Sequence, residues 1–88
     1  MSVYVDNLRK TLKSKHWLFD EGCHLVADSD DELHSFAVRL GLKTKWFQKN
    51  TIHHYDLTRG MRFKALKFGA LEIADLRLVE MIRGKRNI

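Results

Sequence analysis

Three absences limit what this sequence can encode. It contains no proline, only one cysteine, Cys23, and no long apolar run. A single cysteine cannot form an internal disulfide, which is typical of proteins in the reducing cytosol. No segment approaches the roughly 18 apolar residues of a membrane helix, and the N-terminus does not join a basic segment to an apolar one. We therefore expect a cytoplasmic protein that has no membrane partner.

The length and the apolar content predict one small domain. The chain has 88 residues, of which 44% are hydrophobic, and this suits a single globular unit over residues 1–88. A chain of this length buries only roughly 60–65% of its unfolded surface, so its core is small and the pocket of a monomer would be shallow. Association of identical chains would enlarge both, and we expect a homo-oligomer.

Charge is divided unevenly between the two halves of the chain. Residues 1–42 carry five Lys and Arg against seven Asp and Glu, a balance of −2, whereas residues 43–88 carry eleven against four, a balance of +7. The basic half would attract phosphate groups. A solvated lysine-rich surface explains the same charges without any ligand, so nucleic acid stays one partner among several.

Strand and helix patterns alternate along the chain. The clearest is a helix over residues 29–41, with a capping box of Ser29 and Glu32 and with Gly41 as a stop. The basic segment over residues 7–23 has no clear pattern, and we interpret it as a helical turn followed by a loop. The order predicts the α/β class, as a small single-domain sheet of about four short strands with helical crossovers. The predicted strands cover residues 2–5, 24–27, 45–48 and 70–74; the other predicted helices are 56–69, capped by Asp56 or Thr58, and one from Asp75, with Leu76, Val79 and Ile82 inward and Leu78 and Met81 at an interface.

Polar residues follow several of the predicted strands. Asp6 follows the first strand, Asp28 follows the second, and residues 53–56 ("HHYD") come shortly after the third. In open α/β sheets, ligands bind beyond the carboxyl ends of parallel strands. If the strands are parallel, these residues lie near one edge and form a shared site.

A series of motifs gives this chain a resemblance over roughly residues 2–74. They are "VYVD", "HLVADSDDELHSFAVRLGL", "WFQ", "HYDLT" and "GALEI", in that order. In this order they resemble an uncharacterised family, a domain of unknown function found in small bacterial and phage proteins. The resemblance implies a small α/β fold and a frequent phage origin, and hence the host cell cytoplasm, but no activity. The positions that match the family pattern are His24, Ala27, Asp28, Glu32, Leu33, His34, Gly41, Trp46, Phe47, His54, Tyr55 and Asp56.

Two arginines suggest an anion site. Arg59 and Arg62 lie in the first turns of a predicted helix, where each cation opposes the helix dipole at a cost of about 0.3–1 kcal/mol and where a bound anion would be favoured. Gly60 between them permits close approach of a phosphate. A simpler explanation is that Asp56 balances both arginines. In the anion hypothesis, an aromatic ring stacks on a nucleobase, and the ligand-binding residues are Trp46, His54, Tyr55, Asp56, Arg59 and Arg62, with Trp17 as a further candidate.

A second set of residues has metal-ligating chemistry. His24 and Asp28 lie four apart on a predicted strand and so share a face, and His34 lies in the second turn of the next helix. The simpler explanation is that Asp28 only caps this helix and that His34 only bonds to backbone. Cys23 points away from His24, so we do not expect a cysteine nucleophile. The candidate ligands of a divalent metal are Asp6, His24, Asp28, His34, His54 and Asp56.

These candidates lead to three functional hypotheses. The first, which we favour, is a non-catalytic phage or bacterial module that needs no cofactor, binds a nucleotide-like, phosphate-containing ligand, and would sequester a nucleotide signal of host defence. The second is a metal-dependent nuclease or phosphohydrolase, in which Asp6, Asp28, His54 and Asp56 hold a divalent ion that activates water. The third is a nonspecific nucleic-acid-binding protein, favoured by the basic second half. The sequence names no catalytic residue.

Overall fold

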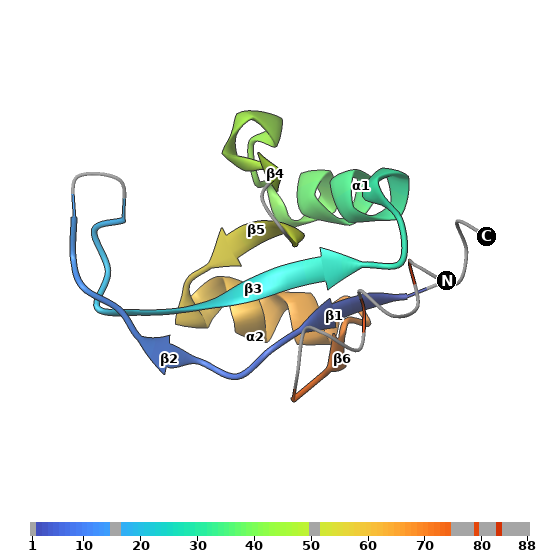
Figure 1. Cartoon of the computed structure of the whole chain (residues 1–88). Helices are drawn as coiled ribbons and strands as arrows, with labels where there is room; N and C mark the ends of the chain where they lie inside the picture. Colours follow the sequence, from blue (N-terminus) through green and yellow to red (C-terminus); the bar gives the residue numbers. More distant parts are fainter. Residues whose placement is uncertain (1, 15–16, 50–51, 75–78, 80–82, 84–88) are drawn as a thin grey trace.

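The computed structural model describes residues 2–14, 17–49, 52–74, 79 and 83. Within these residues, one mixed sheet of six strands packs with two α-helices (Figure 1), which confirms the predicted α/β class. No helix in this part of the chain is long and apolar enough to cross a membrane. The elements are β1 (Val3–Val5), β2 (Arg9–Lys10), β3 (Glu21–Ala27), α1 (Asp30–Leu40), the 3-10 turn η1 (Thr44–Trp46), β4 (Gln48–Lys49), β5 (His53–Leu57), α2 (Arg59–Lys67) and β6 (Leu71–Glu72).

The strands do not all run in one direction. Their order is β4-β5-β3-β1-β6, and β2 pairs with the first residues of β3. β3 is antiparallel to both β1 and β5, whereas β1 and β6 are parallel. Because β1 and β3 are antiparallel, Asp6 and Asp28 lie at opposite ends of the sheet, and the condition for a common edge is not met. The polar residues are brought together by strand pairing instead.

Three segments differ from their predicted structure. Arg9–Lys10 form a strand and not a helical turn, because they pair with Glu21 and Gly22. The predicted strand over residues 45–48 is largely replaced by η1, in which the N–H groups of Trp46 and Phe47 bond back to carbonyls three residues earlier. Residues 53–57 form strand β5, whereas the sequence predicted no strand there and began a helix at Asp56. In each case, hydrogen bonding to the neighbouring backbone overrode the local pattern.

The helix ends follow their predicted chemistry more closely. In α1, the Ser29 hydroxyl accepts from the Glu32 N–H at 3.2 Å, and Gly41 closes the helix with a φ of 90°, as predicted. α2 starts at Arg59, because the Thr58 hydroxyl accepts from the Met61 N–H at 3.2 Å. Thr58 is therefore the cap, and Asp56 belongs to β5. The helix predicted from Asp75 lies largely outside the described residues.

The hydrophobic core lies between one face of the sheet and both helices. Leu25 and Leu57 from the strands belong to the same buried cluster as Leu33 of α1 and Ala65 of α2. Since side chains alternate along a strand, the even-numbered residues of β5 point to the other face of the sheet. Polar side chains gather on that second face.

Candidate metal centre

Two histidines and an aspartate converge on the second face of the sheet. His24 of β3 pairs in register with Asp56 of β5, and His54 lies two residues earlier on β5, so all three side chains share this face. The two imidazole rings meet edge to face, with their centroids 4.9 Å apart. Their placement results from the antiparallel register of two neighbouring strands.

The three ligand atoms lie at spacings close to those of a metal site. Asp56 Oδ1 is 3.6 Å from His54 Nε2 and 3.9 Å from His24 Nε2. Atoms that bind one Zn²⁺ at about 2.0–2.1 Å lie about 3–3.5 Å from each other. The two spacings to Asp56 exceed this by at most a few tenths of an ångström, and all three ligand atoms lie within 4.8 Å of one another. Among the described residues, His24, His54 and Asp56 are the group that could hold an ion.

Both histidines have their other ring nitrogen occupied. His24 Nδ1 lies 2.8 Å from Asp6 Oδ2, and His54 Nδ1 lies 2.7 Å from the Ile52 carbonyl oxygen. A carbonyl or a carboxylate can only accept, so each Nδ1 carries the proton and donates it. In the neutral rings, each Nε2 is then left with a lone pair directed toward Asp56. Metal-binding histidines in proteins are usually held in this way.

Asp6 is the anchor of His24. Its side chain is fully buried, and it accepts a second hydrogen bond, from the His24 backbone N–H at 2.6 Å. Burial would raise the pKa of the Asp6 carboxyl, but the hydrogen bonds from the His24 ring and backbone outweigh it and lower this pKa. The hydrogen bond to Asp6 also raises the pKa of His24, against the opposing effect of burial. A more basic imidazole is a stronger metal ligand.

The other two candidate ligands lie elsewhere. Asp28 accepts from the Ser2 N–H at 3.0 Å and from the Tyr4 hydroxyl at 2.9 Å, at the opposite end of β3. His34 Nδ1 lies 2.8 Å from the Tyr55 hydroxyl, on the face that contacts α1. Of the six candidate metal ligands, the structure thus brings four together, with Asp6 behind His24 and the other three facing one another.

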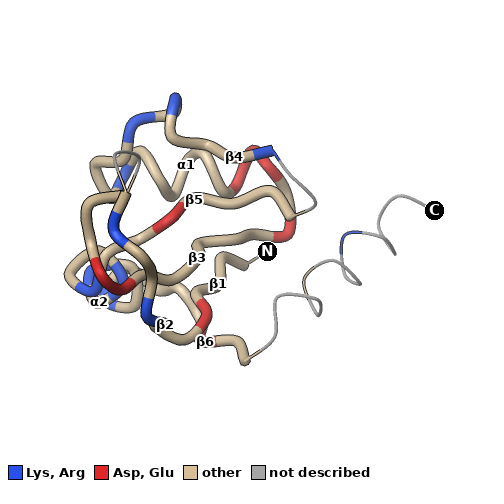
Figure 2. Tube along the Cα trace, turned by 60° about the vertical axis from the view of Figure 1, so that its left-hand side comes forward, with Lys and Arg blue, Asp and Glu red and all other residues tan. Residues whose placement is uncertain are grey.

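The two arginines of the anion hypothesis have protein partners. Arg59 forms a bidentate pair with Glu21, at 2.6 and 2.9 Å, so Glu21 and not Asp56 balances it. This hydrogen bond lowers the pKa of Glu21 and raises that of Arg59. Arg62 Nε donates to the Asp6 carbonyl at 2.9 Å, and its side chain is only 16% exposed. In Figure 2, Lys and Arg are distributed over β2, α2 and the segment before β4.

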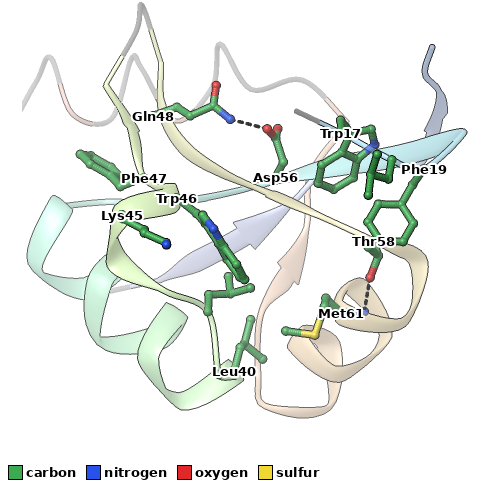
Figure 3. A pocket seen from close by; sticks show the side chains of 13 residues that line it. Trp17, Phe19, Leu40, Lys45, Trp46, Phe47, Gln48, Asp56, Thr58 and Met61 are labelled. Carbon is green, nitrogen blue, oxygen red and sulfur yellow. Dashed lines mark hydrogen bonds between the residues drawn. The ribbon is translucent and has the colours of Figure 1, made fainter. Parts of the chain in front are cut away.

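A cavity of about 750 Å³ lies beside the metal candidate. Asp56 lines the cavity (Figure 3). It also belongs to the metal candidate, together with His24 and His54. Gln48 of β4 also lines the cavity, and its amide nitrogen donates to Asp56 Oδ2. The sequence analysis missed Gln48, because only its cross-strand position opposite His54 brings it to the site.

Tyr55 and Cys23 point into the core and away from this site. Tyr55 is fully buried, and burial raises its phenol pKa. Cys23 is 3% exposed, and burial, with Asp6 and Asp56 nearby, raises its thiol pKa to about 12. A thiol with this pKa is protonated at neutral pH and is a poor nucleophile.

The fold and the site together define a small α/β domain with a histidine and carboxylate cluster on one face of its sheet. The chain belongs to the family described as Protein of unknown function (DUF4031), whose model matches residues 3–85. This match confirms the resemblance to a domain of unknown function. No curated protein and no solved structure gives a significant match to the chain.

Proposed function

We propose that this chain is a metal-dependent phosphohydrolase whose divalent ion is bound by His24, His54 and Asp56. One observation carries the proposal: both histidines donate their Nδ1 protons to fixed acceptors and direct Nε2 toward the same carboxylate oxygen. Two imidazoles and a carboxylate suit Zn²⁺, Mn²⁺ or Fe²⁺.

Three protein ligands leave positions open for a water molecule and a phosphate oxygen. A divalent ion held by His24, His54 and Asp56 would lower the pKa of a water molecule bound to it and so would supply hydroxide near neutral pH. Hydrolysis of a phosphate ester would consume this water: its oxygen would end on phosphorus, the ester P–O bond would break, and the leaving alcohol would carry away a proton. Gln48 and Asp6 orient Asp56 and His24, and both are positioning residues.

A second candidate function is binding of a phosphate-containing small molecule without cleaving it, as in the first hypothesis drawn from the sequence. The cavity favours it, because Trp17, Phe19 and Trp46 line a space large enough for a small molecule next to Asp56. The two candidates share the same site. They differ only in whether a bound phosphate ester is cleaved, and a turnover assay separates them.

The first test is metal binding with matched histidine variants. Protein treated with EDTA and dialysed is titrated with ZnCl₂ in a calorimeter, and one ion per chain is expected. His24→Ala should weaken zinc binding by more than about 100-fold. His53→Ala is the control, because His53 neighbours His54 on β5 but pairs with Asp30 on the other face. Equal zinc affinity in His24→Ala and the wild type would refute the metal centre.

The second test is hydrolysis of bis(p-nitrophenyl) phosphate and p-nitrophenyl phosphate in the presence of Zn²⁺ or Mn²⁺. We expect release of p-nitrophenol from at least one ester, its loss with EDTA, and its return on addition of the metal. His53→Ala should keep the wild-type rate. Stoichiometric metal binding without turnover of either ester would refute catalysis and would favour the binding module.

The cellular setting is part of the proposal. We place the protein in the cytoplasm, because its one cysteine, Cys23, is a buried free thiol and such thiols persist in a reducing compartment. If the chain is phage-encoded, its substrate would be a phosphate ester of the host cell.

Leu12, Leu18 and Leu71 are 92%, 70% and 52% exposed, and association of identical chains would cover such side chains. Light scattering that gave only the 10.4 kDa mass of the monomer would refute the oligomer.

A further inference from the structure

The cavity beside the candidate metal centre has two aromatic walls. Figure 3 shows Trp46 of η1 on one side and Trp17 and Phe19, which precede β3, on the other. Leu40 and Met61 lie below them in this view. A volume of about 750 Å³ lies within the roughly 300–1,000 Å³ of ordinary small-molecule sites. The cavity therefore suits a small ligand with a flat apolar part, and not a protein surface.

Trp17 is held in place by its own neighbours. Its indole N–H donates to the Glu21 carbonyl at 3.3 Å, and its ring meets that of Phe19 at an interplanar angle of 64°. The ring also lies directly against Gly22, where an added Cβ would be 2.9 Å from it. This close approach requires glycine. The wall is thus preformed, which lowers the entropic cost of binding a flat ligand against it.

The opposite wall is uncovered and lies in a positive environment. The Trp46 side chain is 48% exposed, and the Lys43 ammonium lies 5.6 Å from the centre of its ring. Lys45, on the same turn, lines the cavity. An exposed indole beside two lysines fits a ligand that combines a π-face with negative charge.

Polar groups at the cavity distinguish a nucleobase from an acyl chain. Gln48 and Asp56 both line it, and an amide offers donors and an acceptor to the polar edge of a base. Gln48 and Asp56 form one hydrogen bond with each other, and an acyl chain would remove water from their remaining polar atoms, which is unfavourable. Asp56 also defines the orientation of the ligand in the cavity, because the end of the ligand that lies nearest to Asp56 also lies near His24 and His54.

We infer that the cavity binds the base of a free nucleotide or of an unpaired nucleotide end, between Trp46 and Trp17, with the phosphate toward Asp56. The base must be unstacked from its neighbours, because both of its faces would contact indole rings. The inferred position of the phosphate depends on the proposed metal centre, whereas the inferred position of the base does not. This inference narrows the substrate of the proposed phosphohydrolase from any phosphate ester to a nucleotide.

Three ligands separate the two ends in calorimetric titrations. AMP has base, sugar and phosphate; ribose 5-phosphate lacks the base; and adenosine lacks the phosphate. With Zn²⁺-loaded protein, AMP should bind about 5- to 140-fold more tightly than ribose 5-phosphate, since stacking of one base contributes about 1–3 kcal/mol. With EDTA-treated protein, adenosine should still bind. Equal affinity of AMP and ribose 5-phosphate would overturn the inference and leave the metal centre untouched.

Variants of Trp46 test the wall directly. Trp46→Ala should weaken AMP binding by about 5- to 140-fold, and Trp46→Phe should restore most of it, because a phenyl ring still stacks. Phe63→Ala is the control, since Phe63 is 62% exposed on α2 and does not line the cavity. Unchanged AMP affinity in Trp46→Ala would overturn the inference. Folding is not at risk at this half-exposed position.

Two further outcomes are decisive. If adenosine binds EDTA-treated protein but zinc does not bind the wild type, the base pocket stands and the proposed function fails. If decanoate binds more tightly than adenosine, the cavity is a site for apolar chains and the inference is overturned.

Discussion

Replacing Asp6 by asparagine tests whether the histidine cluster is held ready for a metal. Asparagine has nearly the same shape, but it places an NH₂ group where one carboxylate oxygen was. To satisfy that donor, His24 Nδ1 must become an acceptor, and the ring proton moves to Nε2. Nε2 then faces Asp56 as a donor and cannot bind a metal. The change alters the tautomer of His24 and leaves its position in the fold unchanged.

Two magnitudes follow from the contacts of Asp6. Loss of such a histidine partner typically weakens metal binding by about 10- to 100-fold, or about 1.4–2.8 kcal/mol. The buried carboxylate also accepts two hydrogen bonds from His24, at 2.6 and 2.8 Å. Losing one hydrogen bond to a charged group costs about 1.5–3 kcal/mol of folding free energy. In a domain of this size, the melting temperature would fall by roughly 6–24 °C.

Asp28→Asn separates the effect on metal binding from the effect on folding. Asp28 is also buried and accepts hydrogen bonds from Ser2 and Tyr4. It lies four residues after His24, or about 13 Å along the strand direction. It should therefore lower stability without changing zinc affinity. The assay combines zinc calorimetry with thermal melts and with the visible absorption of bound Co²⁺. If Asp6→Asn binds zinc as tightly as Asp28→Asn does, the orientation of His24 by Asp6 is wrong.

Three further predictions concern the fold around the site. Burial raises the pKa of the Cys23 thiol from 9.0 to about 12, so at pH 8 it should react with Ellman's reagent far more slowly in the native protein than in guanidinium chloride. Because the unfolded thiol ionises first, the stability of the fold should decrease as the pH rises above 9.0. Equal labelling rates in the native and the unfolded protein would contradict this burial. Thr58→Ala should lower the free energy of unfolding by about 0.5–2 kcal/mol through loss of the α2 cap, whereas Thr58→Ser should keep it, as read from urea melts. Gly22→Ala should lower the free energy of unfolding by about 1–3 kcal/mol and shift the tryptophan fluorescence emission, because the new methyl group would clash with the Trp17 ring. An unchanged emission spectrum and an unchanged urea midpoint would show that the ring is not held there.

The sequence by itself determined the features that depend on near neighbours. The α/β class and the ends of α1 followed from hydrophobic period and capping residues, because a cap needs only a side chain and an N–H three residues away, as with Ser29 and Glu32. The same reasoning failed at residues 45–48 and 53–57. Residues 44–46 form a 3-10 turn through hydrogen bonds to carbonyls three residues earlier, whereas residues 53–57 form a strand because they pair with β3 and β4, which leaves no mark in the local pattern.

The tertiary structure alone decided which polar residues meet. His24 faces Asp56 because of the register between β3 and β5, and a shift of β5 by one residue would turn Asp56 and His54 to the core side and away from His24. Sequence spacing put His34 and Asp28 in the same candidate set as His24, but the antiparallel sheet places them on another face or at another end. Arg59, one of the two arginines that suggested an anion site, begins α2 and forms its ion pair with Glu21 of β3. Such partners are set by how the chain folds back on itself, and contacts made only then cannot be read along the sequence.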